Sequence, residues 1–342
     1  MLQRGPEKVF LLDSVDDYLG PAEKRFFGEG FRRVTYRYGA LEVTPVKDAR
    51  VELESRLDVG YPVDWSAKAK HGDLRPHLST VDGLIIGVNL SEAALVHTLA
   101  LSPENRRASR AVQIRIKAGT SPDEDLTALP VRTSVLGGAV AVDAVDETVT
   151  RTETLVGGMR VRTEVQHPAG DDRTRTPDTT SSYASPDALL GAADERYYGT
   201  GFTSRAQMIR KVAVDAAHGR ADAVVDIAQG PGSVLPMEGT EGLYQPFVGL
   251  VDAFVTSLQL GQILMYETDG ISRGASNTLW MRTTVLTASA SPEPIRYESP
   301  LRVQLENSSL LERPDGVWRA VDIVGRLAGN SVRCSVAHRL PR

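Results

Sequence analysis

Two aspartates lie near the starts of the two longest apolar stretches of the chain, where a carboxylate could exchange protons with a substrate. Asp252 stands in the segment PFVGLVDAFV and Asp82 in the segment STVDGLIIGV. Apolar surroundings disfavour the charged form of a carboxylate, which favours proton exchange near neutral pH. A buried aspartate without a partner is costly, so we interpret Asp252 as the leading catalytic residue. The alternative is that Asp252 only forms a structural hydrogen bond in its helix.

Asp82 is the second catalytic candidate. Its segment contains two glycines, which are costly inside a helix, so this copy looks the more altered of the two. Asp82 could instead stabilise the interface between the two parts of the chain. For Asp252, we expect replacement by asparagine to abolish turnover and to leave the melting temperature nearly unchanged.

Polar residues close to Asp252 in the sequence could bind a substrate. The substrate-binding candidates are Tyr198, Tyr244, Gln245, Gln259, Asn277 and Arg282. Gln259 lies two helical turns after Asp252 on the same face, although a core amide with satisfied hydrogen bonds fits equally well. Arg282 could bind a phosphate or carboxylate, or could form a structural salt bridge shared with Arg115. Trp280 is interpreted as a packing residue on the same strand face as Arg282.

The positions of these residues follow from an internal repeat. The segment RFFGEGF, residues 25–31, recurs as RYYGTGF, residues 196–202, at an offset of 171 (196 − 25). The further matches, all at similar offsets, are Pro76, Val81, Asp82 and Leu90 with Pro246, Val251, Asp252 and Leu260; Ala108, Ser109 and Arg115 with Ala275, Ser276 and Arg282; and Val161, Arg162, Val165 and His167 with Val332, Arg333, Val336 and His338. Repeats of this kind indicate equivalent structural units. We predict two similar halves, residues 20–180 and 181–342, joined near residues 168–187 by a segment rich in Pro, Ser, Thr and Asp.

Each half shows the same order of elements. A long apolar stretch, residues 76–101 or 246–266, predicts a buried helix whose leading proline occupies its first turn. Several alternating runs predict strands on both sides of that helix. The aromatic-glycine segments lack the third glycine or the lysine of phosphate-binding loops, so we interpret them as matching turns. The fold class is therefore α+β, with one long buried helix wrapped by an antiparallel sheet in each half.

Composition restricts the functional classes. The chain has 342 residues, 41% of them hydrophobic and 24% charged, a single cysteine and a net charge of −5. These values exclude a disulfide framework and a cysteine-rich metal site, and they argue against a broad nucleic-acid-binding face. No His, Asp and Glu cluster has metal-ligand spacing, and no apolar run is long enough to span a membrane. We expect a soluble, cytoplasmic protein without metal or cofactor, and we leave open whether it forms a homodimer.

The predicted arrangement resembles a tandem double hotdog fold, in which each curled antiparallel sheet wraps one long buried helix. The proline, acid and alanine of PFVGLVDA are spaced as in hotdog acyl-thioester dehydratases and AfsA-type butenolide synthases. A dehydratase of this kind also needs a histidine before the helix acid. The second half has none between His218 and Asp252, so only His71 and His77 of the first half could supply it.

A narrower resemblance covers residues 244–286, which look like the avirulence protein D (AvrD) family through the segments SLQLGQ and SNTLWMR. That family is associated with the synthesis of syringolides. The resemblance implies an enzyme that condenses a β-ketoacyl thioester, carried by an acyl carrier protein or coenzyme A, with a ketose such as xylulose or its phosphate. The product would be an acyl ester that closes to a butenolide. The alternatives are a hotdog dehydratase or thioesterase, and a non-catalytic protein that binds a lipid-like signal.

Overall fold

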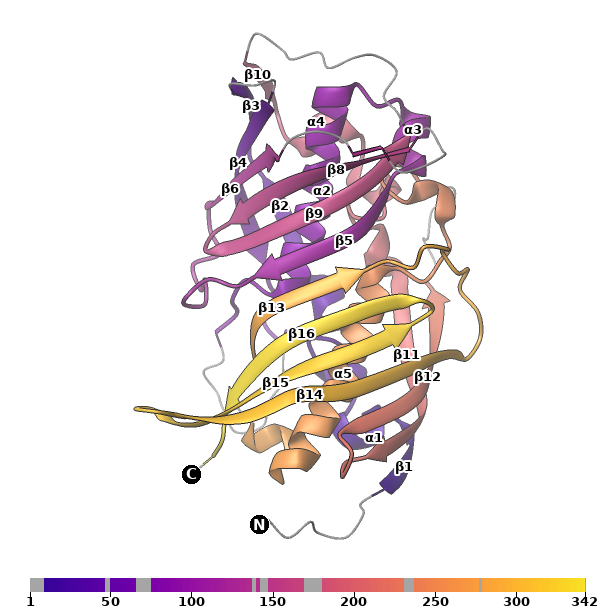
Figure 1. Cartoon of the computed structure of the whole chain (residues 1–342). Coiled ribbons are helices and arrows are strands. Elements are labelled where there is room, and N and C mark those ends of the chain that lie inside the picture. The colour runs from indigo at the N-terminus through magenta and orange to yellow at the C-terminus, as the bar shows by residue number, and fades with distance from the viewer. Residues whose placement is uncertain are drawn as a thin grey trace.

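Two similar halves, each an antiparallel sheet curled around one long helix, make up the molecule (Figure 1). In this computed structural model, the described residues are 9–46, 50–65, 75–136, 140–141, 147–168, 180–230, 237–276 and 279–341. Helix α2 (Thr80–Leu99) fills the first sheet and helix α5 (Leu250–Asp269) fills the second, and both are buried along most of their length. This arrangement is the double hotdog fold, so the predicted fold class is confirmed.

The elements follow one another in the same order in both halves. The first half contains β2 (Thr35–Tyr38), β3 (Leu41–Val46), β4 (Arg50–Gly60), α2, α3 (Pro103–Ala108), β5 (Arg110–Lys117), β6 (Leu129–Val135), β7 (Val140–Ala141), β8 (Glu147–Val156) and β9 (Met159–Pro168). The second contains β11 (Arg205–Asp215), β12 (Arg220–Gln229), η5 (Gly242–Tyr244), α5, η6 (Arg273–Ala275), β13 (Trp280–Thr287), β14 (Ser299–Arg313), β15 (Gly316–Leu327) and β16 (Asn330–Arg339). Before each half come matching short elements: β1 (Val9–Ser14), α1 (Asp16–Leu19), η1 (Ala22–Lys24) and η2 (Gly30–Arg33), and then β10 (Ser181–Tyr183), α4 (Pro186–Leu190), η3 (Ala193–Glu195) and η4 (Gly201–Ser204).

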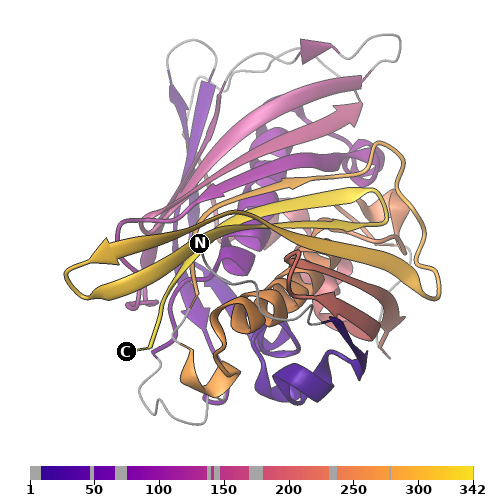
Figure 2. The same ribbon diagram turned by 60° about the horizontal axis from the view of Figure 1, so that its bottom comes forward.

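The two sheets join edge to edge through β5 and β13. The strand order is β1-β11-β12-β14-β15-β16-β13-β5-β9-β8-β6-β4-β3-β10, so the seam lies between two equivalent strands that run antiparallel. Reading outward from the seam, the two halves have the same strand order. The hairpin of β14 and β15 extends beyond the rest of the sheet, as Figure 2 shows.

The short elements that precede each half pack on the other half. Strand β1 pairs with β11 of the second half, and β10 pairs with β3 of the first half. Arg25 donates a hydrogen bond to Gln259 of α5, whereas its equivalent Arg196 donates one to Asn89 of α2. The two halves therefore exchange their leading segments, and the predicted boundary between residues 180 and 181 falls directly before the second exchanged segment.

The predicted helix starts at Pro76 and Pro246 are wrong. The first helix begins at Thr80, because the Ser79 side chain accepts the amide N–H of Asp82 and the Asp82 carboxylate accepts the amide N–H of Ser79. This reciprocal capping satisfies two backbone donors at the helix start. The second helix begins at Leu250, after Gly249. Both prolines thus lie before the helices, in the segments that lead to them.

The predicted match between Arg115 and Arg282 is also wrong. The pairing of β5 with β9 shifts register between Ala111 and Gln113, and the pairing of β13 with β16 shifts between Met281 and Thr283. Because these bulges are equivalent, Arg282 corresponds to Val112 in the repeat. Arg115 therefore corresponds to a residue farther along β13. The offset changes because the segment between η6 and β13 is longer than the link between α3 and β5.

In the described part of the chain, no helix is both long and apolar enough to cross a membrane. Cys334 of β16 is buried against Thr284, and burial raises the pKa of its thiol to about 12.

Candidate active site

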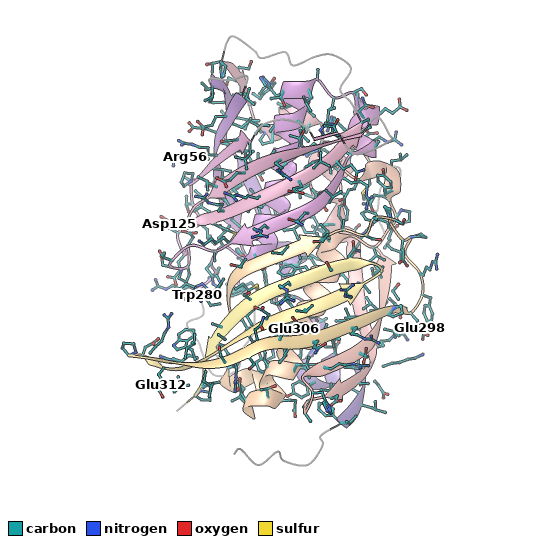
Figure 3. The ribbon with its side chains drawn as sticks, in the orientation of Figure 1. Arg56, Asp125, Trp280, Glu298, Glu306 and Glu312 are labelled. Carbon is teal, nitrogen blue, oxygen red and sulfur yellow. The ribbon has the colours of Figure 1, made fainter. Side chains whose placement is uncertain are left out.

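A cavity of about 310 Å³ opens at the seam between the halves, next to the start of α2. Its wall is rich in aromatic and sulfur-containing side chains: Phe26, Phe27, Trp65, Trp280, Trp318, Met159 and Met281. Its polar and charged lining comprises Arg25, Arg75, His77, Ser79, Ser121, Asp123, Glu124, Gln262 and Arg273. Figure 3 shows the labelled Trp280 at this edge of the seam, with Asp125 of the neighbouring loop above it. Elements of both halves therefore form one apolar slot with a polar end.

The start of α2 forms the polar end of the slot. Ser79 and Thr80, the N-cap and the first residue of the helix, both line the cavity. The first amide groups of a helix lack partners within the helix and carry partial positive charge. His77 lines the same wall, with its ring edge-on to Trp65 at a centroid distance of 6.1 Å. The cavity thus brings an imidazole and a helix start together.

Asp82 lies directly behind this wall and is fully buried. Its Oδ1 accepts a hydrogen bond from Tyr36 at 2.7 Å, and its Oδ2 accepts the hydroxyl of Tyr61 and the amide of Ser79. In the part of the chain that the structure describes, no arginine or lysine pairs with Asp82. Burial raises the pKa of Asp82, although these hydrogen bonds act in the opposite direction.

Asp252, the equivalent residue of α5, has charged and amide partners instead. Its Oδ2 lies 2.9 Å from Nη1 of Arg205, and its Oδ1 accepts a hydrogen bond of 2.7 Å from Gln207. Arg205 and Asp252 are 1% and 0% exposed, so the ion pair is completely buried. The Asp252 carboxylate also accepts the amide N–H of Gly249 at 2.9 Å.

The two helix starts therefore differ in the groups that hold the acid. Gln207 and Tyr36 occupy matching positions, at the same offset of 171 as the aromatic-glycine segments (207 − 36). Tyr61 in one half takes the place of Arg205 in the other, since each donates to the Oδ2 atom of its aspartate. The first half thus pairs its acid with two phenols, and the second half pairs its acid with a cation.

Side chains fill the region before α5. The Tyr244 ring lies 5.2 Å from the Arg110 guanidinium, and Arg110 donates a 2.6 Å hydrogen bond to the Ser289 carbonyl. Tyr198 donates to Glu241 at 2.9 Å, and burial raises the pKa of that carboxyl group to about 7. None of these side chains, and neither Gly249 nor Asp252, lines the cavity at the seam.

The structure brings together only some of the candidate residues from the sequence. Gln245 accepts a hydrogen bond from Arg205, so it belongs to the Asp252 cluster. Gln259 accepts from Arg25 at 2.6 Å and donates to the Phe27 carbonyl at 2.9 Å, which places it in the contact between halves. Arg282 is exposed at the β13 bulge, and Asn277 lies outside the described residues.

Sequence reasoning missed most of the cavity wall. The aromatic-glycine segment does form the predicted turns, but Arg25, Phe26 and Phe27 also line the slot. Trp65 and Trp318 come from distant parts of the chain, so their spacing carries no signal. Of the two histidines that the sequence offered, His77 lines the slot and His71 lies outside the described residues. Among the described residues, no three His, Cys, Asp or Glu side chains gather as a metal site.

Several solved structures align with most of this chain at low sequence identity. The tesB protein of Mycobacterium avium subs. paratuberculosis is 7% identical, with a TM-score of 0.41 over 88% of this chain and 96% of that one. A hot dog fold protein from Alicyclobacillus acidocaldarius is 10% identical, with a TM-score of 0.36 over 87% and 97% of the two chains. The dehydratase-cyclase domain in ambruticin biosynthesis is 14% identical, with a TM-score of 0.35 over 89% and 96%. These values support no inference about chemistry.

Sequence comparison is more specific. No curated protein matches the chain. The model of the family described as Pseudomonas avirulence D protein (AvrD) matches residues 9–341, which is nearly the whole chain. The match extends the resemblance of residues 244–286 over both halves, and the protein therefore belongs to the AvrD family.

Proposed function

We propose that this protein is an enzyme that transfers a β-ketoacyl group from a thioester to the hydroxyl group of a ketose such as xylulose or its phosphate. The ester would then close to a butenolide of syringolide type, as the carbon between its two carbonyls attacks the ketone and water is lost. One observation carries the proposal: His77 and the start of α2 meet at the polar end of an aromatic slot.

The slot suits an acyl chain. Phe26, Phe27 and Trp280 come from both sides of the seam and offer apolar surface to the chain. Burying an acyl chain contributes about 0.8 kcal/mol for each methylene group removed from water. The binding energy of the chain can therefore hold the reacting carbonyl at the polar end.

The start of α2 suits the thioester carbonyl. Ser79 and Thr80 at the helix start line the cavity, and a helix start stabilises the negative charge that develops on the oxygen during acyl transfer. Asp82, together with Tyr36 and Tyr61, fixes the position of this helix start. We assign Asp82 a positioning role.

His77 suits the role of general base. Imidazole is the most frequent general base in enzymes, and this one lies on the cavity wall. It would accept the proton of the ketose hydroxyl as the oxygen attacks the thioester carbon. It would then return the proton to the departing thiolate, so that the products are the ester and the free thiol.

We propose that Asp252 has a structural role at the second helix start. Its carboxylate is bonded to Arg205, Gln207 and Gly249, and Asp252 does not line the cavity at the seam. The sequence favoured Asp252 as the catalytic acid. The geometry supports the first half instead.

The proposal can be tested with a β-ketoacyl thioester of N-acetylcysteamine, with and without xylulose or xylulose phosphate, followed by mass spectrometry. Thiol release that depends on the ketose, together with an acyl-ketose product, would support acyl transfer. Thiol release with water alone would indicate a thioesterase, and an α,β-unsaturated product would indicate a dehydratase. Binding of the thioester without any turnover would indicate a non-catalytic binding protein.

A further inference from the structure

Five basic side chains lie on the outer face of the sheet, on the three strands β5, β9 and β13 at the seam. This basic rim consists of Arg115, Lys117, Arg160, Arg162 and Arg282, all of them exposed. On β5 and β9, they alternate with buried neighbours such as Ile116 and Val161, so they point away from the core. The whole chain carries a net charge of −5, so this concentration of positive charge is local.

The basic rim lies on strands whose neighbouring residues form part of the cavity wall. Ala118, Met159 and Met281 line the cavity. Each is a direct sequence neighbour of a rim residue, namely Lys117, Arg160 and Arg282 in that order. Three adjacent strands, β9, β5 and β13, therefore each pass from the cavity wall to a basic residue in one step.

The arrangement of charges in the rim costs stability. Arg115 lies opposite Arg162, and Lys117 lies opposite Arg160, in the register of β5 with β9. Like charges in directly opposite positions destabilise a strand pair. Glu153 contacts both Arg160 at 3.2 Å and Arg162 at 2.7 Å, whereas Arg115 and Lys117 make no ion pair in the described part of the chain.

The second half lacks this concentration of charge. The positions that correspond to Arg115, Lys117 and Arg160 are occupied by Val285, Thr287 and Ser331. Arg333, which corresponds to Arg162, has two acidic partners, Asp322 and Glu306. Four of the five rim residues therefore belong to the half whose helix start borders the cavity, and Arg282 comes from the adjoining strand β13 of the other half.

We propose that the basic rim docks an acidic acyl carrier domain, which delivers the β-ketoacyl thioester into the cavity on its flexible phosphopantetheine arm. This inference rests on the proposed function. The rim covers the outer surface of a curled sheet, and Arg160 and Arg162 are 49% and 54% exposed. Small-ligand sites are concave and bury most of the ligand, so this surface suits a protein with several carboxylates better than a nucleotide. The acids nearest the mouth already have partners, since Asp123 accepts the amide of Gly158 and Glu124 lies 3.7 Å from Arg75.

The test compares two double variants with the same change in net charge. Arg115→Glu with Lys117→Glu reverses the charge of two rim residues, and Arg296→Glu with Arg326→Glu reverses two exposed arginines of the second half as a control. The probe is a bacterial fatty-acid acyl carrier protein loaded with a β-ketodecanoyl group. Its binding is measured by calorimetry without ketose, so that the result does not depend on turnover.

We expect the rim variant to weaken carrier binding by about tenfold or more, and the control variant to change it by less than about twofold. Binding to the wild-type protein should weaken steeply as salt is added. Equal effects of the two variants, or no carrier binding to the wild type, would overturn the docking proposal.

A second comparison separates docking from catalysis. The ratio of kcat/KM for the carrier-bound substrate to kcat/KM for the N-acetylcysteamine thioester should fall about tenfold in the rim variant. If the rim variant instead loses binding of the coenzyme A thioester and not of the loaded carrier, the surface is a nucleotide site and our inference is wrong. If the rim variant weakens carrier binding but the wild-type protein forms no ester, the docking inference is supported and the proposed acyl transfer is wrong.

Discussion

The two aspartates at the helix starts look alike in the sequence but have different surroundings in the structure. Asp82 accepts hydrogen bonds from Tyr36 and Tyr61, whereas Asp252 forms an ion pair with Arg205. Burial raises the pKa of Asp82, although the hydrogen bonds from the two phenols act in the opposite direction. Two changes of partner, Tyr36 in place of Gln207 and Tyr61 in place of Arg205, therefore distinguish the two helix starts.

His77 is expected to carry the chemical step. Replacement of His77 by glutamine removes the proposed base and keeps a polar side chain on the cavity wall, so kcat should fall by about 100-fold or more. The KM for the thioester should change much less, since the aromatic slot is untouched. Thiol release with xylulose present measures both constants. His218→Gln, at an exposed histidine paired with Asp215, is the matched control. A kcat close to the wild-type value in His77→Gln would remove this residue from the mechanism.

Asp252→Asn is expected to destabilise the protein, because it leaves the guanidinium of Arg205 buried without a counter-charge. Breaking a buried ion pair on one side typically costs about 3–5 kcal/mol. This replaces the sequence-based expectation of an unchanged melting temperature. Urea unfolding of Asp252→Asn and of Asp194→Asn, an exposed control, gives the comparison. A loss below about 1 kcal/mol in Asp252→Asn would contradict a structural role for the pair.

The stability contributed by Asp82 should depend on pH. Because burial raises its pKa in the folded protein above the ordinary value of 3.8, the folded state binds the proton more tightly than the unfolded state. This contribution is complete below about pH 4 and is lost as the pH rises through the folded-state pKa. The free energy of unfolding of the wild type, relative to Asp82→Asn, should therefore fall as the pH rises above about 4. A difference that rises with pH in urea titrations would show that the buried carboxylate is held charged.

At the scale of the elements, close approach of helix to sheet explains the glycines of α2. A Cβ atom at Gly87 would lie 2.5 Å from Cγ1 of Val161 on β9, which is closer than atoms can pack. The sequence interpretation took the two glycines of this helix as signs of decay. In the structure they allow α2 to lie against the strand that carries Met159 and Arg160 of the cavity mouth.

Gly87→Ala should therefore destabilise the protein, although alanine favours a helix by about 1 kcal/mol over glycine. Overpacking of this kind costs about 1–3 kcal/mol. The added Val161→Ala substitution removes the obstructing methyl groups, so the double variant should be more stable than the sum of the two single changes predicts. Urea unfolding of the four proteins measures the coupling. Additive losses would show that the contact at Gly87 relaxes without cost.

The sequence predicted the elements better than their boundaries or their contacts. The long helices were detectable, since apolar residues predominate from Val81 and from Val251. The residues at which the helices begin were not detectable. Hydrogen bonds between Ser79 and Asp82 set the start of the first helix, whereas the nearby proline indicated an earlier start. The cavity could not be predicted, because its wall comes from elements that only the folded seam brings together.

At the scale of the whole molecule, the halves are linked in three ways. Strands β5 and β13 join the sheets, β1 crosses to the second half, and β10 crosses to the first. The exchanged segments add buried polar contacts, among them Arg25 with Gln259 and Arg196 with Asn89. The seam also forms the cavity, so the proposed chemistry depends on both halves.

Neither sequence half should fold by itself. A fragment of residues 1–180 keeps β1 but not its partner β11, and a fragment of residues 181–342 loses β1 and keeps a β10 without β3. Each fragment alone should show no cooperative unfolding in urea by circular dichroism. Its edge strand, β5 or β13, has lost its pairing partner, and its core has lost the segment that the other half supplies. The two fragments expressed together should copurify in a 1:1 ratio through a tag on either one, and the pair should unfold in a single transition seen equally by circular dichroism and tryptophan fluorescence. A cooperative transition in either fragment alone would mean that the halves are independent domains and that the exchange of segments contributes little to the fold.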